Sequence, residues 1–264
     1  MAYLELENLT KHFRRRTGLF TPPEIVKAVD HVDLSINEGE IIGLVGESGC
    51  GKSTLSRLIM QLLMPTEGSV VLQGKRLADL TPEEIRKRRR DFQMIFQDPY
   101  ASLNPRMTIF STIAEAVLTR HPDLGKDWDK LTAQVSLLME QVGLDSRYIR
   151  KYPHEFSGGQ RQRIAIARAL ATEPKLIIAD EPVSALDVSI QSQILNLLRH
   201  LQRDLNLTMI FITHDLSVVR YIADRIAVME KGKIVELGES ESVFKNPQSP
   251  CAQVLLNAIP KIQF

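Results

Sequence analysis

Apolar and polar positions change their spacing along the chain, and each spacing predicts a different element. Three early segments alternate or are rich in β-branched and apolar residues: Tyr3 to Leu9, Ala28 to Ile36 and Ser69 to Leu72. The turn sequences Asn-Glu-Gly at 37–39 and Glu-Gly at 67–68 interrupt them. This pattern predicts short antiparallel strands.

A second pattern is a compact apolar strand followed by a glycine-rich loop and an amphipathic helix. The strand is expected from Glu40 to Val45, and the helix from Thr54 onward. The helix is expected to place its apolar residues on one face. These residues are Leu55, Leu58, Ile59, Leu62 and Leu63.

Two further apolar strands, Lys175 to Ala179 and Thr208 to Thr213, each end at acidic or histidine residues. The segment Ile190 to Leu205 between them has a helical pattern. Alternating strands and helices predict a parallel sheet with chemistry at the carboxyl ends of its strands.

The region from Met107 to Leu170 is mostly helical in pattern, and Arg225 to Leu237 reads as a hairpin that turns at Lys231-Gly232. Short helical pieces are expected after the hairpin. The predicted fold class is α/β, with a mixed sheet, an antiparallel β subdomain and an inserted α-helical subdomain. We expect one domain over 1–264, with a core from 1–104 and 171–240, a helical subdomain at 105–170 and a C-terminal tail at 241–264.

Composition narrows the classes of protein. The 264 residues are 44% hydrophobic, enough for one substantial core, and Lys and Arg total 33 against 32 for Asp and Glu. This balance gives no general attraction for nucleic acid, and the basic run Arg86 to Arg90 is more typical of a solvated helical face. No segment approaches the ~18 apolar residues of a membrane span. The two cysteines cannot form a disulfide framework, which fits a reducing compartment.

The loop between the strand expected at Glu40 to Val45 and the helix after it matches the phosphate-binding P-loop motif. Its glycines allow backbone N–H groups to point at phosphate oxygens, and the helix N-terminus adds a favourable dipole potential. Lys52 is expected to contact the β- and γ-phosphates, and the Ser53 hydroxyl to bind Mg²⁺. A flexible glycine-rich turn is the structural alternative. The loop residues are Gly46, Glu47, Ser48, Gly49, Cys50, Gly51, Lys52, Ser53 and Thr54.

Cys50 lies inside this loop, beside Lys52 and just before a helix N-terminus. If the loop is exposed, its thiol is expected to react readily with alkylating agents. Because the loop grips phosphate through backbone groups, the sulfur itself is expected to be dispensable.

Asp180 and Glu181 end a buried apolar strand. Adjacent carboxylates there suit a Mg²⁺ contact, assigned to Asp180, and a general base that activates water, assigned to Glu181. A solvated strand end is the alternative, and the P-loop in the same chain favours the functional interpretation.

Three more positions are ambiguous by themselves. Ser157 and Gln160 have the spacing of a helix capping box, and Gly158 and Gly159 between them leave backbone open to a phosphate. His214, directly after a strand, could reach a γ-phosphate, and Gln97 could orient water or touch a metal. A helix cap and ordinary polar surface residues are the alternatives.

Taken in order, these motifs, together with Ser184-Ala-Leu-Asp187, resemble those of ABC-transporter nucleotide-binding subunits across essentially the whole chain. The resemblance implies the ABC ATPase fold, a P-loop NTPase core. It implies ATP and Mg²⁺ as cofactors and ATP hydrolysis coupled to solute movement. It further implies that Phe13 stacks on adenine, that His214 senses the γ-phosphate, that Gln97 couples nucleotide state to the membrane subunits, and that Asp187 lies at a dimer interface.

The same resemblance implies a head-to-tail pair of ATPase subunits, with each ATP held between the P-loop of one and the Ser157–Gln160 helix of the other. The expected partners are two transmembrane permease subunits, a second and related ATPase and, indirectly, an extracytoplasmic solute-binding protein. No nucleic-acid partner is expected. The expected location is the cytoplasmic face of the inner membrane.

Residues 96–105 and 246–260 are similar to the subgroup that takes up peptides and nickel. The chain departs from that subgroup at Ser249-Pro250-Cys251, where His-Pro-Tyr is usual, and at Phe156, where Leu is commoner. We therefore expect uptake of peptides or similar polar solutes, with nickel or a metal chelate as an alternative. ABC ATPases that act on DNA or ribosomes, and P-loop kinases, are the rival classes.

Overall fold

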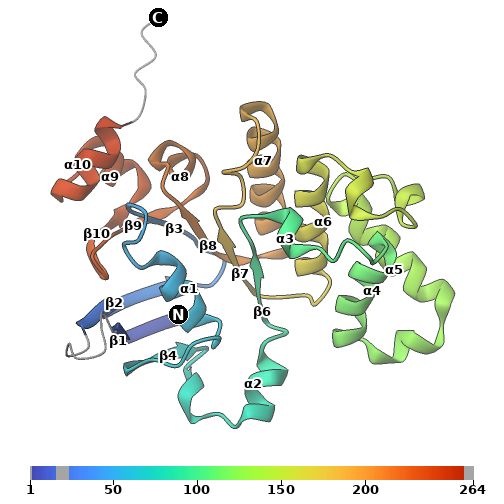
Figure 1. Cartoon of the computed structure of the whole chain (residues 1–264), viewed down its shortest axis with the longest axis horizontal. Coiled ribbons are helices and arrows are strands. Elements are labelled where there is room, and N and C mark those ends of the chain that lie inside the picture. The colour runs from blue at the N-terminus through green and yellow to red at the C-terminus, as the bar shows by residue number, and fades with distance from the viewer. Residues whose placement is uncertain (1, 16–23, 259–264) are drawn as a thin grey trace, which may run out of the picture. The chain divides into compact units, whose positions relative to one another are not determined.

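The computed structural model describes residues 2–15 and 24–258 (Figure 1). Its contacts divide the chain into two units, Met1–Ile85 with Thr208–Phe264, and Arg86–Leu207. We call these the first and second unit. The expected helical subdomain, 105–170, falls within the second unit, and its boundaries stay a prediction. Residues 259–264 of the expected C-terminal tail lie outside the described residues.

The first unit contains an antiparallel sheet in the order β2-β1-β4-β5. Along β2 the residues alternate between buried and exposed from Asp30 to Asn37, as expected for a strand with one face against a core. The antiparallel strands predicted from the sequence are confirmed. The strands are β1 (Ala2–Arg15), β2 (Glu24–Asn37), β4 (Glu67–Leu72) and β5 (Lys75–Arg76).

A second set of strands in the first unit forms a mixed arrangement. β3 (Ile41–Val45) pairs in parallel with β8 (Thr208–Thr213) and with β9 (Arg225–Glu230), and β10 (Lys233–Glu239) runs antiparallel to β9. Every residue of β3 and β8 is buried, which is why both segments are continuously apolar. The predicted parallel strands and closing hairpin are therefore confirmed.

Helix α1 (Lys52–Ile59) follows β3, as expected, but it is shorter than the apolar pattern suggested. Gln61 has a φ of 53°, a left-handed conformation that ends the helix. Leu62 and Leu63 lie beyond it, so their assignment to the helical face was wrong. The other helices of this unit are α8 (Leu216–Ile222), α9 (Ser240–Lys245) and α10 (Pro250–Asn257), with a 3₁₀ turn at Leu77–Asp79. Helix α2 (Pro82–Arg88) contains the boundary between the two units, which falls after Ile85.

The second unit has two parallel strands, β6 (Phe92–Ile95) and β7 (Leu176–Asp180), and is otherwise helical. Ile113 and Val117 of α4 and Val135 and Met139 of α5 are completely buried, and each such side chain contributes about 1.5–3 kcal/mol by burial. The prediction of a mostly helical region is confirmed. The helices are α3 (Pro99–Ser102), α4 (Ile109–Arg120), α5 (Trp128–Gln141), α6 (Gly158–Leu170) and α7 (Val188–Leu205), with 3₁₀ turns at Pro122–Lys126, Ser146–Tyr148 and Pro153–Glu155.

No helix in the described part of the chain combines the length and apolar character that a bilayer crossing requires.

Candidate functional site

The glycine-rich loop lies between the end of β3 and the start of α1, in the first unit. Gly51 precedes the helix with a φ of 116°, and a Cβ there would lie 2.1 Å from the Ala28 carbonyl oxygen. Only glycine fits, because a side chain would meet both a steric clash and an unfavourable backbone conformation. The first N–H groups of α1 have no carbonyl partner four residues earlier in the helix, so they add positive potential at the loop.

Lys52 supplies the second positive element of the loop. Its Nζ donates to the carbonyl oxygens of Gly46 at 2.7 Å and Glu47 at 2.9 Å, and the residue is 6% exposed. The ammonium group is thus held within the curl of the loop. Glu47 and Ser53 are exposed at the loop and at the first turn of α1. A cation enclosed by backbone and a helix N-terminus suits a polyphosphate.

The structure corrects the expectation for Cys50. Its side chain is 8% exposed, and its sulfur lies 3.8 Å from the Lys52 Nζ. The condition for rapid alkylation, an exposed thiol, is therefore not met. Cys251 is also buried, and burial together with the nearby Glu230 and Glu47 raises the pKa of its thiol.

In the second unit, Gln97 meets two side chains of the segment that follows β7, Glu181 and Ser184. Gln97 Nε2 donates to Glu181 Oε2 at 3.0 Å and to Ser184 Oγ at 3.3 Å. The Ser184 hydroxyl donates to the Glu181 backbone carbonyl at 3.1 Å. The structure therefore brings together the predicted general base and the predicted coupling glutamine. The sequence predicts no role for Ser184, because a hydroxyl contact to an amide 87 residues away leaves no local signal.

Glu181 has an unusual backbone. Its φ is 46°, in the left-handed region that non-glycine residues rarely adopt, which costs about 1–3 kcal/mol. Asp180, immediately before it, is the last residue of β7 and is half-buried. Such strain persists only where the surrounding structure holds the residue in place, and it is concentrated at functional sites.

The Ser157–Gln160 segment forms the predicted capping box at the start of α6. The Gln160 N–H donates to Ser157 Oγ at 3.4 Å, and the Ser157 N–H donates to Gln160 Oε1 at 3.0 Å. A Cβ on Gly159 would lie 2.5 Å from Ile190 Cγ2 of α7. The glycine therefore allows α6 and α7 to pack closely.

The remaining predicted residues lie at element ends or on a strand. Phe13 is on β1 and is 40% exposed, and His214 is exposed directly after β8; both belong to the first unit. Asp187 is the N-cap residue of α7 and is exposed in the second unit. The roles of these residues, like those of Asp180 and Gln160, stay predictions.

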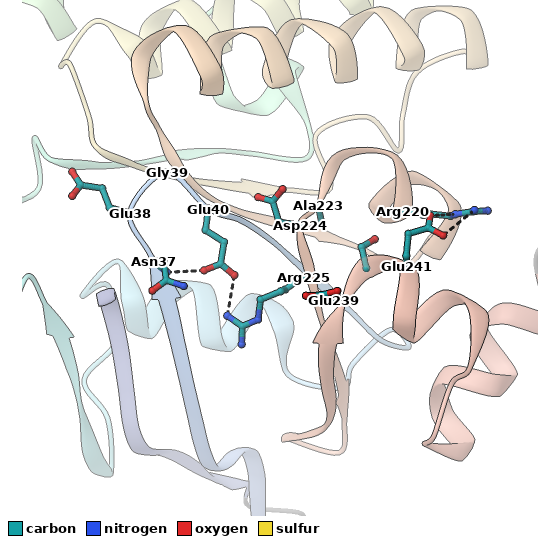
Figure 2. Close-up of a pocket in the computed structure, with 11 residues that line it drawn as sticks. Asn37, Glu38, Gly39, Glu40, Arg220, Ala223, Asp224, Arg225, Glu239 and Glu241 are labelled. Carbon is teal, nitrogen blue, oxygen red and sulfur yellow. Dashed lines mark hydrogen bonds and ion pairs between the residues drawn. The ribbon is translucent and has the colours of Figure 1, made fainter. Parts of the chain in front are cut away.

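A separate hollow of about 500 Å³ lies in the first unit at the start of β3, the end opposite the P-loop (Figure 2). Arg225 Nη1 donates to Glu40 Oε1 at 2.9 Å, and Glu40 Oε2 accepts from the Asn37 N–H at 2.7 Å. Asp224 accepts from the Ile41 N–H at 2.8 Å. These contacts fix the first residue of β3 and thereby support the strand that carries the loop.

A family model described as "ABC transporter" matches residues 29–184. The oligopeptide transport ATP-binding protein OppF of Escherichia coli strain K12 is 53% identical over 260 residues, which are 97% of this chain and 77% of the relative. AppF of Bacillus subtilis strain 168, another oligopeptide transport ATP-binding protein, is 51% identical over 97% of this chain and 78% of its own length.

Solved structures are also similar. The ATP-binding cassette MJ0796, in a post-hydrolysis state bound to ADP and Pi, has a TM-score of 0.77 and 32% identity, covering 90% of this chain and 98% of that chain. CbiO1 from Clostridium perfringens, part of the ABC transporter complex cbiONQ, has a TM-score of 0.78 and 28% identity, covering 93% and 91%. These structures agree with the α/β fold expected from the sequence.

Proposed function

The chain belongs to the ABC transporter family, and from that premise we propose that it is the ATP-hydrolysing subunit of a peptide importer. The single observation that carries the proposal is the P-loop, in which Lys52 is enclosed by the loop's own carbonyl groups. The similarity to oligopeptide transport proteins over 97% of the chain supports the peptide class.

In the proposed reaction, water attacks the γ-phosphorus of ATP, the bond to the ADP oxygen breaks, and ADP and inorganic phosphate leave. Lys52 and the loop N–H groups bind the phosphates and offset the charge of the leaving oxygen. Glu181 accepts the proton of the attacking water. The Gln97 amide, 3.0 Å from Glu181, orients that carboxylate, and His214 contacts the γ-phosphate.

The chain offers oxygen ligands of the kind that Mg²⁺ prefers. They are the exposed hydroxyl of Ser53, the carboxylate of Asp180 and the amide oxygen of Gln97, whose two hydrogen bonds use its nitrogen instead. When bound, Mg²⁺ neutralises phosphate charge. Phe13 stacks on adenine in this proposal, and Ser157 to Gln160 with Asp187 complete the site of a second ATPase subunit.

We further propose that the chain acts at the cytoplasmic face of the membrane through two permease subunits. Its second ATPase is a related but different chain, and an extracytoplasmic binding protein delivers the solute. Closure around ATP and reopening after hydrolysis would shift the permease between conformations.

Purification of the complex from its native source, followed by mass spectrometry, tests this proposal. The expected result is two permease chains, a related ATPase and bound peptides. Recovery with ribosomes or nucleic acid, without membrane chains, would contradict it. A complex with two copies of this chain alone would overturn the pairing.

A further inference from the structure

The turn between β9 and β10 contacts the back of the phosphate loop. The Gly232 N–H donates to the Cys50 carbonyl oxygen at 2.8 Å, and the Gly232 carbonyl accepts from the Asp30 N–H at 2.9 Å. Gly232 thus links β2 to the P-loop through its two backbone groups. The Gly232 hydrogen bond thereby fixes the Cys50 peptide in a loop of the kind whose backbone N–H groups bind phosphate.

Strand β2 also touches the loop directly. The Ala28 carbonyl oxygen lies where a Cβ of Gly51 would be, at 2.1 Å. Farther along, β2 pairs with β1 so that Val26 is opposite Phe13 and Lys27 is opposite His12. The strand pair that carries Phe13 is therefore anchored against the phosphate loop within the same unit.

Asp30 joins the strand and the turn by charge as well as by backbone. Its side chain is 8% exposed, and its carboxylate lies 3.5 Å from Lys27 Nζ on β2 and 3.4 Å from Lys233 Nζ on β10. His31 Nε2 and His12 Nε2 also face it, at 3.6 and 4.0 Å. Burial opposes ionisation of Asp30, but the ammonium groups of Lys233 and Lys27 outweigh it, so its pKa is lower than usual.

We propose that Asp30 is a positioning residue that fixes the spacing between Phe13 and the phosphate loop, and thereby sets the affinity for ATP. This inference rests on the proposed function, in which Phe13 stacks on adenine while the loop holds the phosphates. The affinity of a ligand that contacts both Phe13 and the loop depends on the spacing between them. The affinity of a ligand that contacts only the loop does not.

The test compares the binding of ATP and of inorganic tripolyphosphate to the full chain, by calorimetry with EDTA present to prevent hydrolysis. Asp30→Asn keeps the backbone N–H but removes the charge that holds Lys27 and Lys233. We expect it to weaken ATP binding about fivefold to tenfold and tripolyphosphate binding less than about twofold. The matched control is Asp33→Asn on the same strand, where the Asp33 carboxylate accepts a hydrogen bond from the Asn8 backbone N–H at 2.7 Å.

A second pair of variants serves if Asp30→Asn does not fold. Lys233→Gln removes one partner of Asp30, whereas Lys231→Gln changes the lysine on the other side of Gly232, which pairs with Glu230 instead. We expect about twofold weaker ATP binding from Lys233→Gln, because one ion pair with an exposed lysine contributes little, and no change from Lys231→Gln.

Combination with Phe13→Ala separates positioning from general stability. If Asp30 acts through Phe13, Asp30→Asn should have little further effect on ATP binding in the Phe13→Ala background. Three results would overturn the inference: equal losses of affinity for ATP and tripolyphosphate, additive effects with Phe13→Ala, or unchanged ATP binding in Asp30→Asn. In each case, ATP binding by the wild-type chain would still uphold the proposed function. Failure of the wild-type chain to bind ATP would overturn both.

Discussion

At the scale of single residues, Glu181 carries the proposed chemistry. Its carboxylate accepts a hydrogen bond from the Gln97 amide, and its backbone is held in a left-handed conformation by the surrounding structure. Glu181→Gln preserves the size of the side chain and an oxygen that can accept from Gln97, but it cannot take a proton from water.

We therefore expect Glu181→Gln to bind ATP as the wild type does while its turnover falls about 100-fold to 10,000-fold, the usual contribution of a general base. Phosphate release and ATP binding are to be measured on the same preparations. Glu140→Gln, an exposed change on α5, is the matched control. Turnover within twofold of wild type would show that the base is another group.

The burial of Cys50 and Cys251 leads to a second prediction at this scale. Because both cysteines are buried, each 8% exposed as a residue, maleimide should label the folded chain slowly and label both cysteines quickly once urea unfolds it. The readout is mass spectrometry of labelled peptides. Rapid labelling of Cys50 in the folded chain that Mg-ATP prevents would contradict this prediction and show that the thiol is exposed in the loop.

At the scale of elements, the packing of α6 on α7 depends on Gly159. A methyl group there would lie 2.5 Å from Ile190, whereas one on Gly158 would be 3.5 Å from Leu186, an ordinary contact. Gly159→Ala should therefore lower the free energy of unfolding by about 1–3 kcal/mol, the usual effect of overpacking, and Gly158→Ala should change it far less.

Urea denaturation measures the free energy of unfolding of both variants. Addition of Ile190→Ala to Gly159→Ala should recover part of the loss, because it removes the methyl group that clashes. Strictly additive destabilisation by the two changes would show that the clash is not the cause.

The anchoring of α10 gives a pH-dependent prediction. Glu236 on β10 accepts from the Gln248 N–H at 2.9 Å and the Ser249 N–H at 2.8 Å. Burial opposes ionisation of Glu236, but these two bonds outweigh it, so its pKa is lower than the ordinary 4.5. A lowered pKa means that the anchoring is complete above pH 4.5 and is lost as the pH falls through the folded-state pKa.

We expect Glu236→Gln to increase hydrogen exchange in residues 246–257 about fivefold to tenfold at pH 7, since one of two acceptors is lost. Glu239→Gln on the same strand is the control. After correction for intrinsic rates, wild-type exchange should approach that of the variant as the pH falls through the lowered folded-state pKa of Glu236. Equal protection in both proteins at pH 7 would contradict the anchoring.

The local sequence pattern was sufficient to predict most helices and strands and the P-loop. Strand alternation and the order of strand, loop and helix are short-range properties of the sequence. The end of α1 was missed because Gln61, rather than Gly or Asn, adopts the left-handed conformation. The burial of Cys50 and the cluster around Asp30 were also missed. The turn at Gly232 contacts both Cys50 and Asp30 from about 180–200 residues away in sequence, and no local pattern predicts such contacts.

At the scale of the whole molecule, the chain belongs to a family whose members hydrolyse ATP as parts of transporter complexes, and the identity to oligopeptide transport proteins extends over nearly all of it. In the proposed function, ATP hydrolysis by this chain drives peptide uptake. Uptake needs the assembled complex, so hydrolysis and uptake are measured together in that complex.

The most direct measurement reconstitutes the native complex in lipid vesicles and records uptake of a labelled peptide and release of phosphate together. With wild-type chain, we expect both to require ATP, and with Glu181→Gln in this chain alone we expect both to fall by at least about tenfold. Peptide uptake that continues at the wild-type rate in the variant, or that proceeds without ATP, would contradict the account.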